Sequence, residues 1–232
     1  MFNLSESIAA LADKIDRGGR LSRSEAKTFL SEAPLALLGL LATHAKERKS
    51  GKAVFYNRNF HIEPTNVCVF NCRFCSYRRP ADSPDAWDYS KEEILAQVDS
   101  HRGSGATEVH IVGGVHPRNG LDYYIDLIRS VKGRMPQASV KAFTAIELAY
   151  MINKGGLPLE EGLRRLKEAG MEAIPGGGAE IFAEPVRSRI CPEKGTADEW
   201  LSVHRTAHRL GIPTNATILY GHIESLDDRI DH

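Results

Sequence analysis

The hydrophobic residues of this 232-residue chain follow two different rhythms. Between residues 4 and 15 they recur every three or four positions, which predicts an amphipathic helix that stops at the Gly18–Gly19 pair. Ser22 and Glu25 have the spacing of a capping box for a second helix. Residues 35–45 predict a third helix, whose basic end suits the helix dipole. We therefore expect residues 1–52 to form a helical segment that packs on the rest of the chain.

From about residue 54 short β-type runs alternate with helical stretches. The runs cover residues 54–62, 108–112, 139–144, 171–174 and 214–219. Two of the intervening helices open at capping boxes, Ser90 with Glu93 and Thr196 with Glu199. Runs that begin roughly 30 to 45 residues apart are typical of βαβ units, which form a parallel sheet.

Such repeats build either a closed barrel or an open doubly wound sheet. No Gly-x-Gly-x-x-Gly follows the first run, which counts against a dinucleotide-binding sheet. We expect an α/β fold in which residues 53–232 form a β/α barrel of the TIM type. Only five strands are predicted, whereas such a barrel takes about 250 residues. We therefore expect a barrel that is incomplete at its C-terminal end, and a chain that is a fragment of a longer protein.

Charge and composition narrow the classes of partner. The 30 Lys and Arg residues balance the 30 Asp and Glu residues, which counts against broad binding to nucleic acid or to an anionic membrane. We find no secretory signal and no apolar stretch of about 18 residues, so we expect a cytoplasmic protein. Four cysteines are too few for a disulfide scaffold, and three of them fall within eight residues, which favours a metal site.

Those three cysteines are Cys68, Cys72 and Cys75, in a C-x3-C-x2-C run that follows the first predicted strand. The loop would lie at the C-terminal end of that strand, where barrel active sites are found. Three thiolates on a [4Fe–4S] cluster leave one iron open to an external ligand. A structural zinc site would need a fourth ligand, and Cys191 is far along the chain. Zinc, or buried cysteines without a metal, are the alternatives, and we take Cys191 for an ordinary thiol.

Further polar residues follow the predicted strands. His222 comes just after the fifth run and is a candidate general base, because the pKa of histidine lies near neutrality; a structural hydrogen bond is the alternative. His61 and Glu63 share one face of the first strand and would reach the cavity if that face points inward. Arg78 and Arg79 flank the cysteine run and suit an anionic substrate or cluster, with simple surface placement as the alternative.

The cysteine spacing, with Phe74 just before the last cysteine, resembles the radical S-adenosylmethionine (SAM) superfamily. The resemblance implies that Cys68, Cys72 and Cys75 hold a [4Fe–4S] cluster whose open iron binds SAM. Reduction would then cleave SAM to methionine and a 5′-deoxyadenosyl radical. The superfamily fold is a full or partial β/α barrel.

The resemblance also implies a SAM site around Phe74. Gly113 and Gly114 match a glycine pair that meets the methionyl amino group, although Val115 replaces the acidic residue that follows in the family. The implied contacts are therefore from the backbone alone. Glu180, after three glycines, would accept hydrogen bonds from the ribose hydroxyls. A glycine turn without a ligand is the alternative at both places.

From about residue 57 the chain resembles one branch of the superfamily, which holds the futalosine-pathway enzymes of menaquinone synthesis and the enzymes that build the deazaflavin FO. The stretches that match cover residues 63–68, 110–117, 141–147, 175–180 and 220–224. Residues 110–114, 141–145 and 190–194 favour the aminodeoxyfutalosine synthase family.

This likeness implies a transferase that consumes SAM as a co-substrate. The deoxyadenosyl radical would add to the enolpyruvyl double bond of 3-[(1-carboxyvinyl)oxy]benzoate, and bicarbonate would be lost to give 6-amino-6-deoxyfutalosine. Arg78, Arg79 and Lys141 are candidates for binding this dicarboxylate, and a reducing partner such as flavodoxin or ferredoxin would supply the electron. The alternatives are a cyclic dehypoxanthine futalosine synthase, an FO-synthase type of enzyme, an Fe–S electron carrier and a zinc-stabilised binding module.

Overall fold

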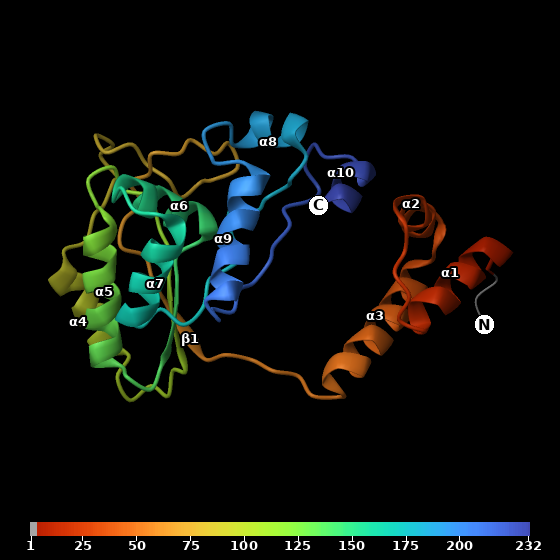
Figure 1. The fold of residues 1–232 in the computed structure, drawn as a ribbon, viewed down its shortest axis with the longest axis horizontal. Helices are drawn as coiled ribbons and strands as arrows, with labels where there is room; N and C mark the ends of the chain where they lie inside the picture. Colours follow the sequence, from red (N-terminus) through yellow and green to blue (C-terminus); the bar gives the residue numbers. More distant parts are fainter. Residues whose placement is uncertain (1–3) are drawn as a thin grey trace. The chain divides into compact units, whose positions relative to one another are not determined.

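In the computed structural model, which describes residues 4–232, the chain divides into two compact units (Figure 1). One unit is Asn57–His222. The other is made by the described residues up to Tyr56 together with Ile223–His232.

The smaller unit is helical. Its helices are α1 (Glu6–Asp16), α2 (Arg23–Glu32), α3 (Leu35–Ser50) and α10 (Leu226–Asp231). The predicted capping box of α2 is present, since the Ser22 hydroxyl accepts from the Glu25 N–H while the Glu25 carboxylate accepts from the Ser22 N–H. The apolar faces of α1, α2 and α3 enclose a small core of Ile8, Phe29, Leu37 and Leu41. Helices α1, α2 and α3 lie where the sequence predicted them.

The larger unit is built on a parallel sheet. Its strands β1 (Asn59–Ile62), β2 (Glu108–Ile111) and β3 (Ser139–Ala142) lie in the order β1-β2-β3. In the register, His61 lies opposite His110, and His110 opposite Lys141. Six helices surround the sheet: α4 (Lys91–Ser100), α5 (Leu121–Arg134), α6 (Ala145–Lys154), α7 (Leu159–Ala169), α8 (Glu184–Ile190) and α9 (Ala197–Arg209). The α/β class and the parallel strands are as the sequence predicted.

The predicted strands at 171–174 and 214–219 are wrong as regular strands. Each contributes only isolated parallel bridges, Lys141 with Ala173 and Ile174 with Thr214. The hydrogen bond from the Ala142 N–H to the Ala173 carbonyl, at 3.0 Å, continues the sheet in the same direction. The bridges thus extend the parallel sheet in the order of the chain, and the described residues do not close a barrel.

The predicted run at 54–62 is also too long. Val54, Phe55 and Tyr56 are more than 80% exposed and precede β1. Pairing begins where the Arg58 carbonyl accepts from the Thr107 N–H at 2.7 Å, so residues before it have no neighbouring strand. Their apolar character alone suggested a strand.

The two faces of the sheet differ in polarity. Phe60, Ile62, Val109 and Ile111 are buried in the main core, which α4 and α5 complete. The alternate residues point to the opposite face, because side chains alternate along a strand. That face, which we call the inner face for reference, carries polar groups: Asn59 and His61, which are exposed, and Glu108, His110, Ser139 and Lys141.

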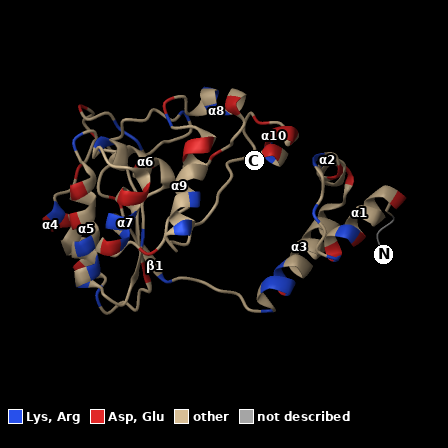
Figure 2. Ribbon diagram, viewed as in Figure 1, with Lys and Arg blue, Asp and Glu red and all other residues tan. Residues whose placement is uncertain are grey.

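Charges on the helices follow the helix dipole. Figure 2 shows α9 red where it begins and blue where it ends. Asp198 and Glu199 occupy its first turn, and His208 and Arg209 its last. Acidic groups at the start and basic groups at the end stabilise a helix. No helix among the described residues is long and apolar enough to cross a membrane.

Candidate active site

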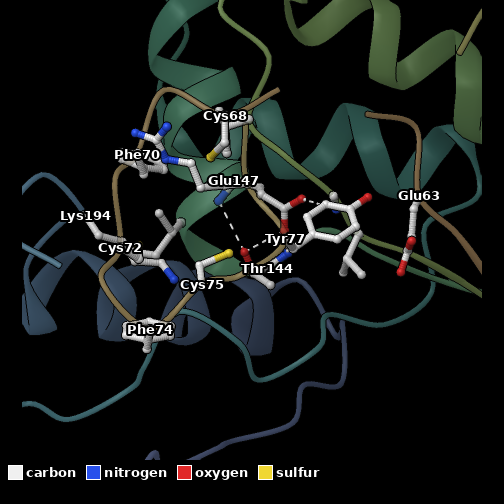
Figure 3. Close-up of a pocket in the computed structure, with 15 residues that line it drawn as sticks. Glu63, Cys68, Phe70, Cys72, Phe74, Cys75, Tyr77, Thr144, Glu147 and Lys194 are labelled. Carbon is white, nitrogen blue, oxygen red and sulfur yellow. Dashed lines mark hydrogen bonds between the residues drawn. The ribbon is translucent and has the colours of Figure 1, made fainter. Parts of the chain in front are cut away.

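A cavity of about 250 Å³ lies at the C-terminal ends of the three strands (Figure 3). Glu63 follows β1, Gly113 follows β2, and Thr144 follows β3, so each strand delivers part of the wall. The other lining residues are Cys68, Phe70, Cys72, Phe74, Cys75, Tyr77, Arg78, Val112, Val115, Ile146, Glu147 and Lys194. This edge of a parallel sheet is where α/β proteins bind ligands.

The cysteine loop is held by backbone hydrogen bonds. The Cys68 N–H donates to the Arg79 carbonyl at 3.1 Å, and the Val69 N–H donates to the Val115 carbonyl at 3.0 Å. Further along the loop, the Arg73 N–H donates to the Ile190 carbonyl at 2.8 Å. The loop is thus fixed to the end of β2 on one side and to the end of α8 on the other.

The segment before the loop is anchored by two buried polar side chains. The Thr65 hydroxyl donates to the Trp87 carbonyl at 2.7 Å. The Asn66 side chain, fully buried, donates to the Asp85 carbonyl and accepts from the Trp87 N–H. Both side chains satisfy backbone groups that have no partner in a helix or a strand. They determine where the chain enters the cysteine loop.

All three loop cysteines line the cavity as free thiols. Cys72 is buried, and desolvation raises the pKa of its thiol to about 11, while the Lys194 ammonium acts in the opposite direction. Among the described residues, no three His, Cys, Asp or Glu side chains lie close enough to hold a single metal ion. The three thiols instead lie at separate places on the cavity wall. This suits an iron–sulfur cluster, because each cysteine binds a different iron and the ligands must surround the cluster.

Gly113 and Gly114, which follow β2, lie so close to another part of the backbone that a side chain would not fit. A Cβ on Gly114 would lie 2.2 Å from the Val67 carbonyl oxygen, and one on Gly113 would lie 2.9 Å from the Thr65 carbonyl oxygen. Only glycine allows the end of β2 to approach the segment that leads into Cys68 so closely. Of the two, Gly113 lines the cavity, whereas Gly114 is buried and does not line it.

Glu147 was not among the predicted site residues, yet it is the buried carboxylate of this cavity. One of its oxygens accepts from the Gly113 N–H at 3.1 Å, and the other from the Thr144 N–H at 2.7 Å. Burial raises the pKa of Glu147, although these hydrogen bonds lower it. Thr144 and Glu147 form a capping box, the sequence signal by which α6 and this carboxylate are recognisable.

Tyr77 is a second residue that sequence reasoning missed. It lines the cavity, and its hydroxyl lies 3.4 Å from the Thr65 carbonyl oxygen. Burial raises the pKa of Tyr77, and the neighbouring Glu63 carboxylate raises it further. The phenol is therefore a neutral hydrogen-bond donor at the wall of the cavity. A single tyrosine nine residues after Cys68 carries no signal of its own in the sequence.

Several predicted site residues meet in this cavity. Besides the three cysteines, Glu63, Phe74 and Arg78 line it. Phe74 is 42% exposed, and the Lys194 ammonium lies 5.6 Å from the centre of its ring.

Other predicted residues lie elsewhere. The Arg79 guanidinium pairs with Asp85 at 2.5 Å and donates to the Ser76 carbonyl at 2.8 Å, so it stabilises its own loop. The Glu180 carboxylate pairs with Lys194 at 2.5 Å. Neither Arg79 nor Glu180 lines the cavity.

His61 and Lys141 belong to the inner face of the sheet. The rings of His61 and His110 meet edge to face with centroids 4.6 Å apart. Lys141 pairs with the buried Glu108 at 3.0 Å. His222 is exposed, and its Nε2 lies 3.1 Å from the Leu219 carbonyl oxygen. These three residues are not part of the cavity wall.

A loop of three cysteines at the edge of a parallel β/α sheet, beside a glycine pair, defines a class of protein. The chain belongs to the radical SAM superfamily, whose family model matches residues 62–232. Enzymes of this superfamily use a [4Fe–4S] cluster and SAM, and Cys68, Cys72 and Cys75 are the residues here that fit the cluster.

Two named relatives show which enzymes of the superfamily the chain is similar to. The chain is 44% identical over 222 residues to an aminodeoxyfutalosine synthase of Thermus thermophilus, covering 96% of this chain and 60% of that protein. It is 40% identical over 223 residues to a 5-amino-6-(D-ribitylamino)uracil–L-tyrosine 4-hydroxyphenyl transferase of Methanopyrus kandleri, covering 96% and 59%. The chain thus spans about 60% of the length of these relatives.

A solved structure shares the fold. The crystal structure of methylornithine synthase superposes with a TM-score of 0.73 at 19% identity, over 95% of this chain and 62% of that one. At this identity the likeness concerns the fold alone. It agrees with the parallel sheet and its surrounding helices.

Proposed function

We propose that this chain carries the radical SAM part of an aminodeoxyfutalosine synthase. The observation that supports this most directly is the 44% identity to the Thermus thermophilus relative of that name, which extends over nearly the whole chain. The reaction would break the C5′–S bond of SAM, releasing methionine, and add the 5′-deoxyadenosyl group to 3-[(1-carboxyvinyl)oxy]benzoate; with one water consumed, it would give 6-amino-6-deoxyfutalosine and bicarbonate. The cluster and SAM supply the one-electron cleavage that starts the reaction.

The cavity suits an aromatic, anionic substrate. Phe70, Phe74 and Tyr77 provide aromatic surface, and Arg78 provides a guanidinium at the cavity wall. Guanidinium groups bind carboxylates through paired hydrogen bonds. Of the three basic residues expected to bind the substrate, Arg78 is the one with this support, because Arg79 and Lys141 are paired with Asp85 and Glu108.

Exclusion of water is the second task of this wall. Holding an alkene beside the reacting carbon supplies much of the rate advantage in an addition. Val112, Val115 and Ile146 contribute apolar surface to the cavity wall. We further propose that the sheet is the first part of a β/α barrel, that an electron donor such as flavodoxin or ferredoxin serves it, and that the protein is cytoplasmic.

A second candidate function rests on the Methanopyrus kandleri relative, which is only slightly less similar. By its name that enzyme joins 5-amino-6-(D-ribitylamino)uracil to the hydroxyphenyl group of tyrosine. The same aromatic cavity wall would suit that substrate pair. The two functions differ in whether the adenosyl group ends in the product.

The test uses the full-length protein with its cluster reconstituted under anaerobic conditions and reduced by dithionite. SAM is supplied with the enolpyruvyl benzoate or with the uracil and tyrosine, and products are identified by mass. We expect an adenosyl adduct of the benzoate. Free 5′-deoxyadenosine as the sole nucleoside product would reject the addition, and a hydroxyphenyl–uracil adduct would establish the second function instead.

The role of Arg78 is tested by Arg78→Met, which should raise the KM for the benzoate about tenfold or more, since a charged hydrogen-bonding pair is worth roughly 1.5–3 kcal/mol. Arg73→Met is the matched control, because Arg73 is exposed on the same loop and does not line the cavity. Equal effects of the two changes would argue against a role for Arg78 in binding.

A further inference from the structure

A second wall of the cavity comes from far along the chain. We refer to residues 190–195 as the strap, because they lie against the cysteine loop. The Asn71 N–H donates to the Glu193 carboxylate at 2.6 Å, and the Arg73 N–H donates to the Ile190 carbonyl at 2.8 Å. The strap also buries Cys191 in the same apolar cluster as Cys72. Two hydrogen bonds and this cluster fix the strap beside the thiols.

The strap brings one cation into the cavity. Lys194 lines the cavity, and Figure 3 shows it beside Cys72 and Phe74. Its ammonium lies 2.5 Å from the Glu180 carboxylate, and the two side chains are only 15% and 13% exposed. Glu180 is held in turn by the backbone, since its carbonyl accepts from the Leu219 N–H at 2.7 Å. The charge of Lys194 is therefore fixed in position and shielded from water.

Lys194 stays protonated in this setting. Burial lowers the pKa of Lys194, but the Glu180 carboxylate and the sulfur groups of Cys72 and Cys191 together more than offset the burial, and the net pKa is raised. An ion pair that is removed from water adds little to stability on balance. Stability therefore does not explain why the Lys194–Glu180 ion pair lies at the cavity wall beside three cysteines.

We propose that Lys194 is a fixed positive charge that raises the reduction potential of the cluster bound by Cys68, Cys72 and Cys75, and that Glu180 limits this effect. Each one-electron reduction adds a negative charge to the cluster, with dithionite or a donor protein as the source of the electron. Net charge near a cluster is among the factors that set its potential. A cation in a shielded site acts on it more strongly than one in water.

The proposal rests on membership in the superfamily and not on the substrate. Three variants measure it: Glu180→Gln, Lys194→Met with Glu180→Gln, and the control Lys132→Met. Glu180→Gln keeps the ammonium and removes the carboxylate, whereas the double variant removes both charges. Lys132 pairs with Glu172 at 2.9 Å and does not line the cavity.

Each reconstituted protein is titrated with dithionite while the reduced cluster is followed by electron paramagnetic resonance, without SAM or substrate. Iron and sulfide are quantified first, so that only proteins with equal cluster content are compared. We expect the double variant to be at least tenfold harder to reduce than Glu180→Gln, which is 59 mV more negative for one electron. The wild type should lie between them, and Lys132→Met should match the wild type.

Equal potentials for the single and double variants would overturn the proposal. So would a shift in Lys132→Met as large as that between them. If the double variant fails to hold a cluster, Glu180→Gln still decides, because the proposal requires its potential to be more positive than that of the wild type. None of these outcomes depends on the proposed transferase reaction.

Discussion

The Glu147 carboxylate accepts a hydrogen bond from the backbone N–H of Gly113 at 3.1 Å. Its other oxygen accepts from the Thr144 N–H and hydroxyl. Since Gly113 follows β2 and Thr144 follows β3, one buried side chain joins the ends of two strands and the start of α6. The cavity wall therefore depends on this carboxylate.

We expect Glu147→Ala to destabilise the fold by roughly 3 kcal/mol, because two buried N–H groups lose their acceptor. Urea unfolding followed by circular dichroism measures the loss. Glu93→Ala removes the equivalent residue from an exposed capping box, where water replaces the carboxylate, and its effect should be much smaller. Similar losses in both variants would mean that Glu147 acts only as a helix cap.

The cluster ligands are tested against Cys191, which is buried like Cys72. Single replacement of Cys68, Cys72 or Cys75 by Ala should abolish cluster assembly, because each provides one of three ligands. Cys191→Ala is the matched control. Cys191 is buried in the same group of apolar side chains as Cys72, but it does not line the cavity. Iron and sulfide analysis after anaerobic reconstitution gives the result. A cluster retained in any of the first three variants would contradict the ligand set.

Gly114→Ala should prevent the normal approach of β2 to the cysteine loop. Its Cβ would lie 2.2 Å from a backbone oxygen that no side-chain rotation can move away. We expect a loss of about 3 kcal/mol in unfolding free energy and reduced iron content. Gly133→Ala in the exposed part of α5, where a Cβ meets nothing within 4 Å, should instead stabilise the protein by about 0.5–1 kcal/mol. Normal cluster content in Gly114→Ala would show that the loop tolerates the shift.

Arg187 is 2% exposed, and its guanidinium donates to the carbonyls of Gly178, Ala179 and Gly195. It thereby ties the strap to the glycine-rich loop. Arg187→Lys should cost roughly 2–4 kcal/mol in unfolding free energy, because an ammonium cannot reach all three acceptors. Arg189→Lys, exposed on the same helix, should stay within about 0.5 kcal/mol of the wild type. Equal stability of the two variants would show that the three hydrogen bonds contribute nothing.

His204 predicts a pH dependence of stability. Burial lowers the pKa of His204 to about 4, and the charge of His208 contributes in the same direction. In the unfolded chain this histidine is protonated below about pH 6.5, whereas in the folded chain it stays neutral down to about pH 4. The folded state is therefore fully stable with respect to this group above about pH 6.5 and loses stability as the pH falls from there towards about 4. With 1.36 kcal/mol per pKa unit, the loss should be roughly 2–3 kcal/mol. Urea midpoints between pH 7 and pH 4 measure it.

His204→Gln should flatten that pH profile, whereas His101→Gln, a half-buried histidine of the same unit, should preserve its slope. An unchanged slope in His204→Gln would assign the pH dependence to other groups.

The sequence predicted the parts of the site that depend on local spacing. The cysteines lie on one short loop, and the capping boxes at Ser90 and Thr196 begin α4 and α9 where expected. Apolar character misled at Val54–Tyr56, because a strand exists only where a neighbour pairs with it. The local pattern of apolar residues does not tell whether a neighbouring strand is present.

Contacts between distant segments account for the rest. Nothing near Lys194 in the chain indicates that it lies beside Cys72, since the strap reaches the loop only in the folded unit. Glu180, expected at a ribose, pairs with that lysine. Arg79, expected at a substrate, pairs with Asp85 only six residues on; this contact is local, but the spacing of the two residues in an irregular loop does not predict it.

The division of the sheet into an apolar outer face and a polar inner face has a consequence for how such proteins diversify. In β1, Phe60 and Ile62 belong to the core, while His61 between them lies on the polar face and is exposed. A substitution at every second position can thus alter the chemistry of the polar face without disturbing the packing that holds the strand. Enzymes with different reactions can then descend from one scaffold through small, separately tolerated steps.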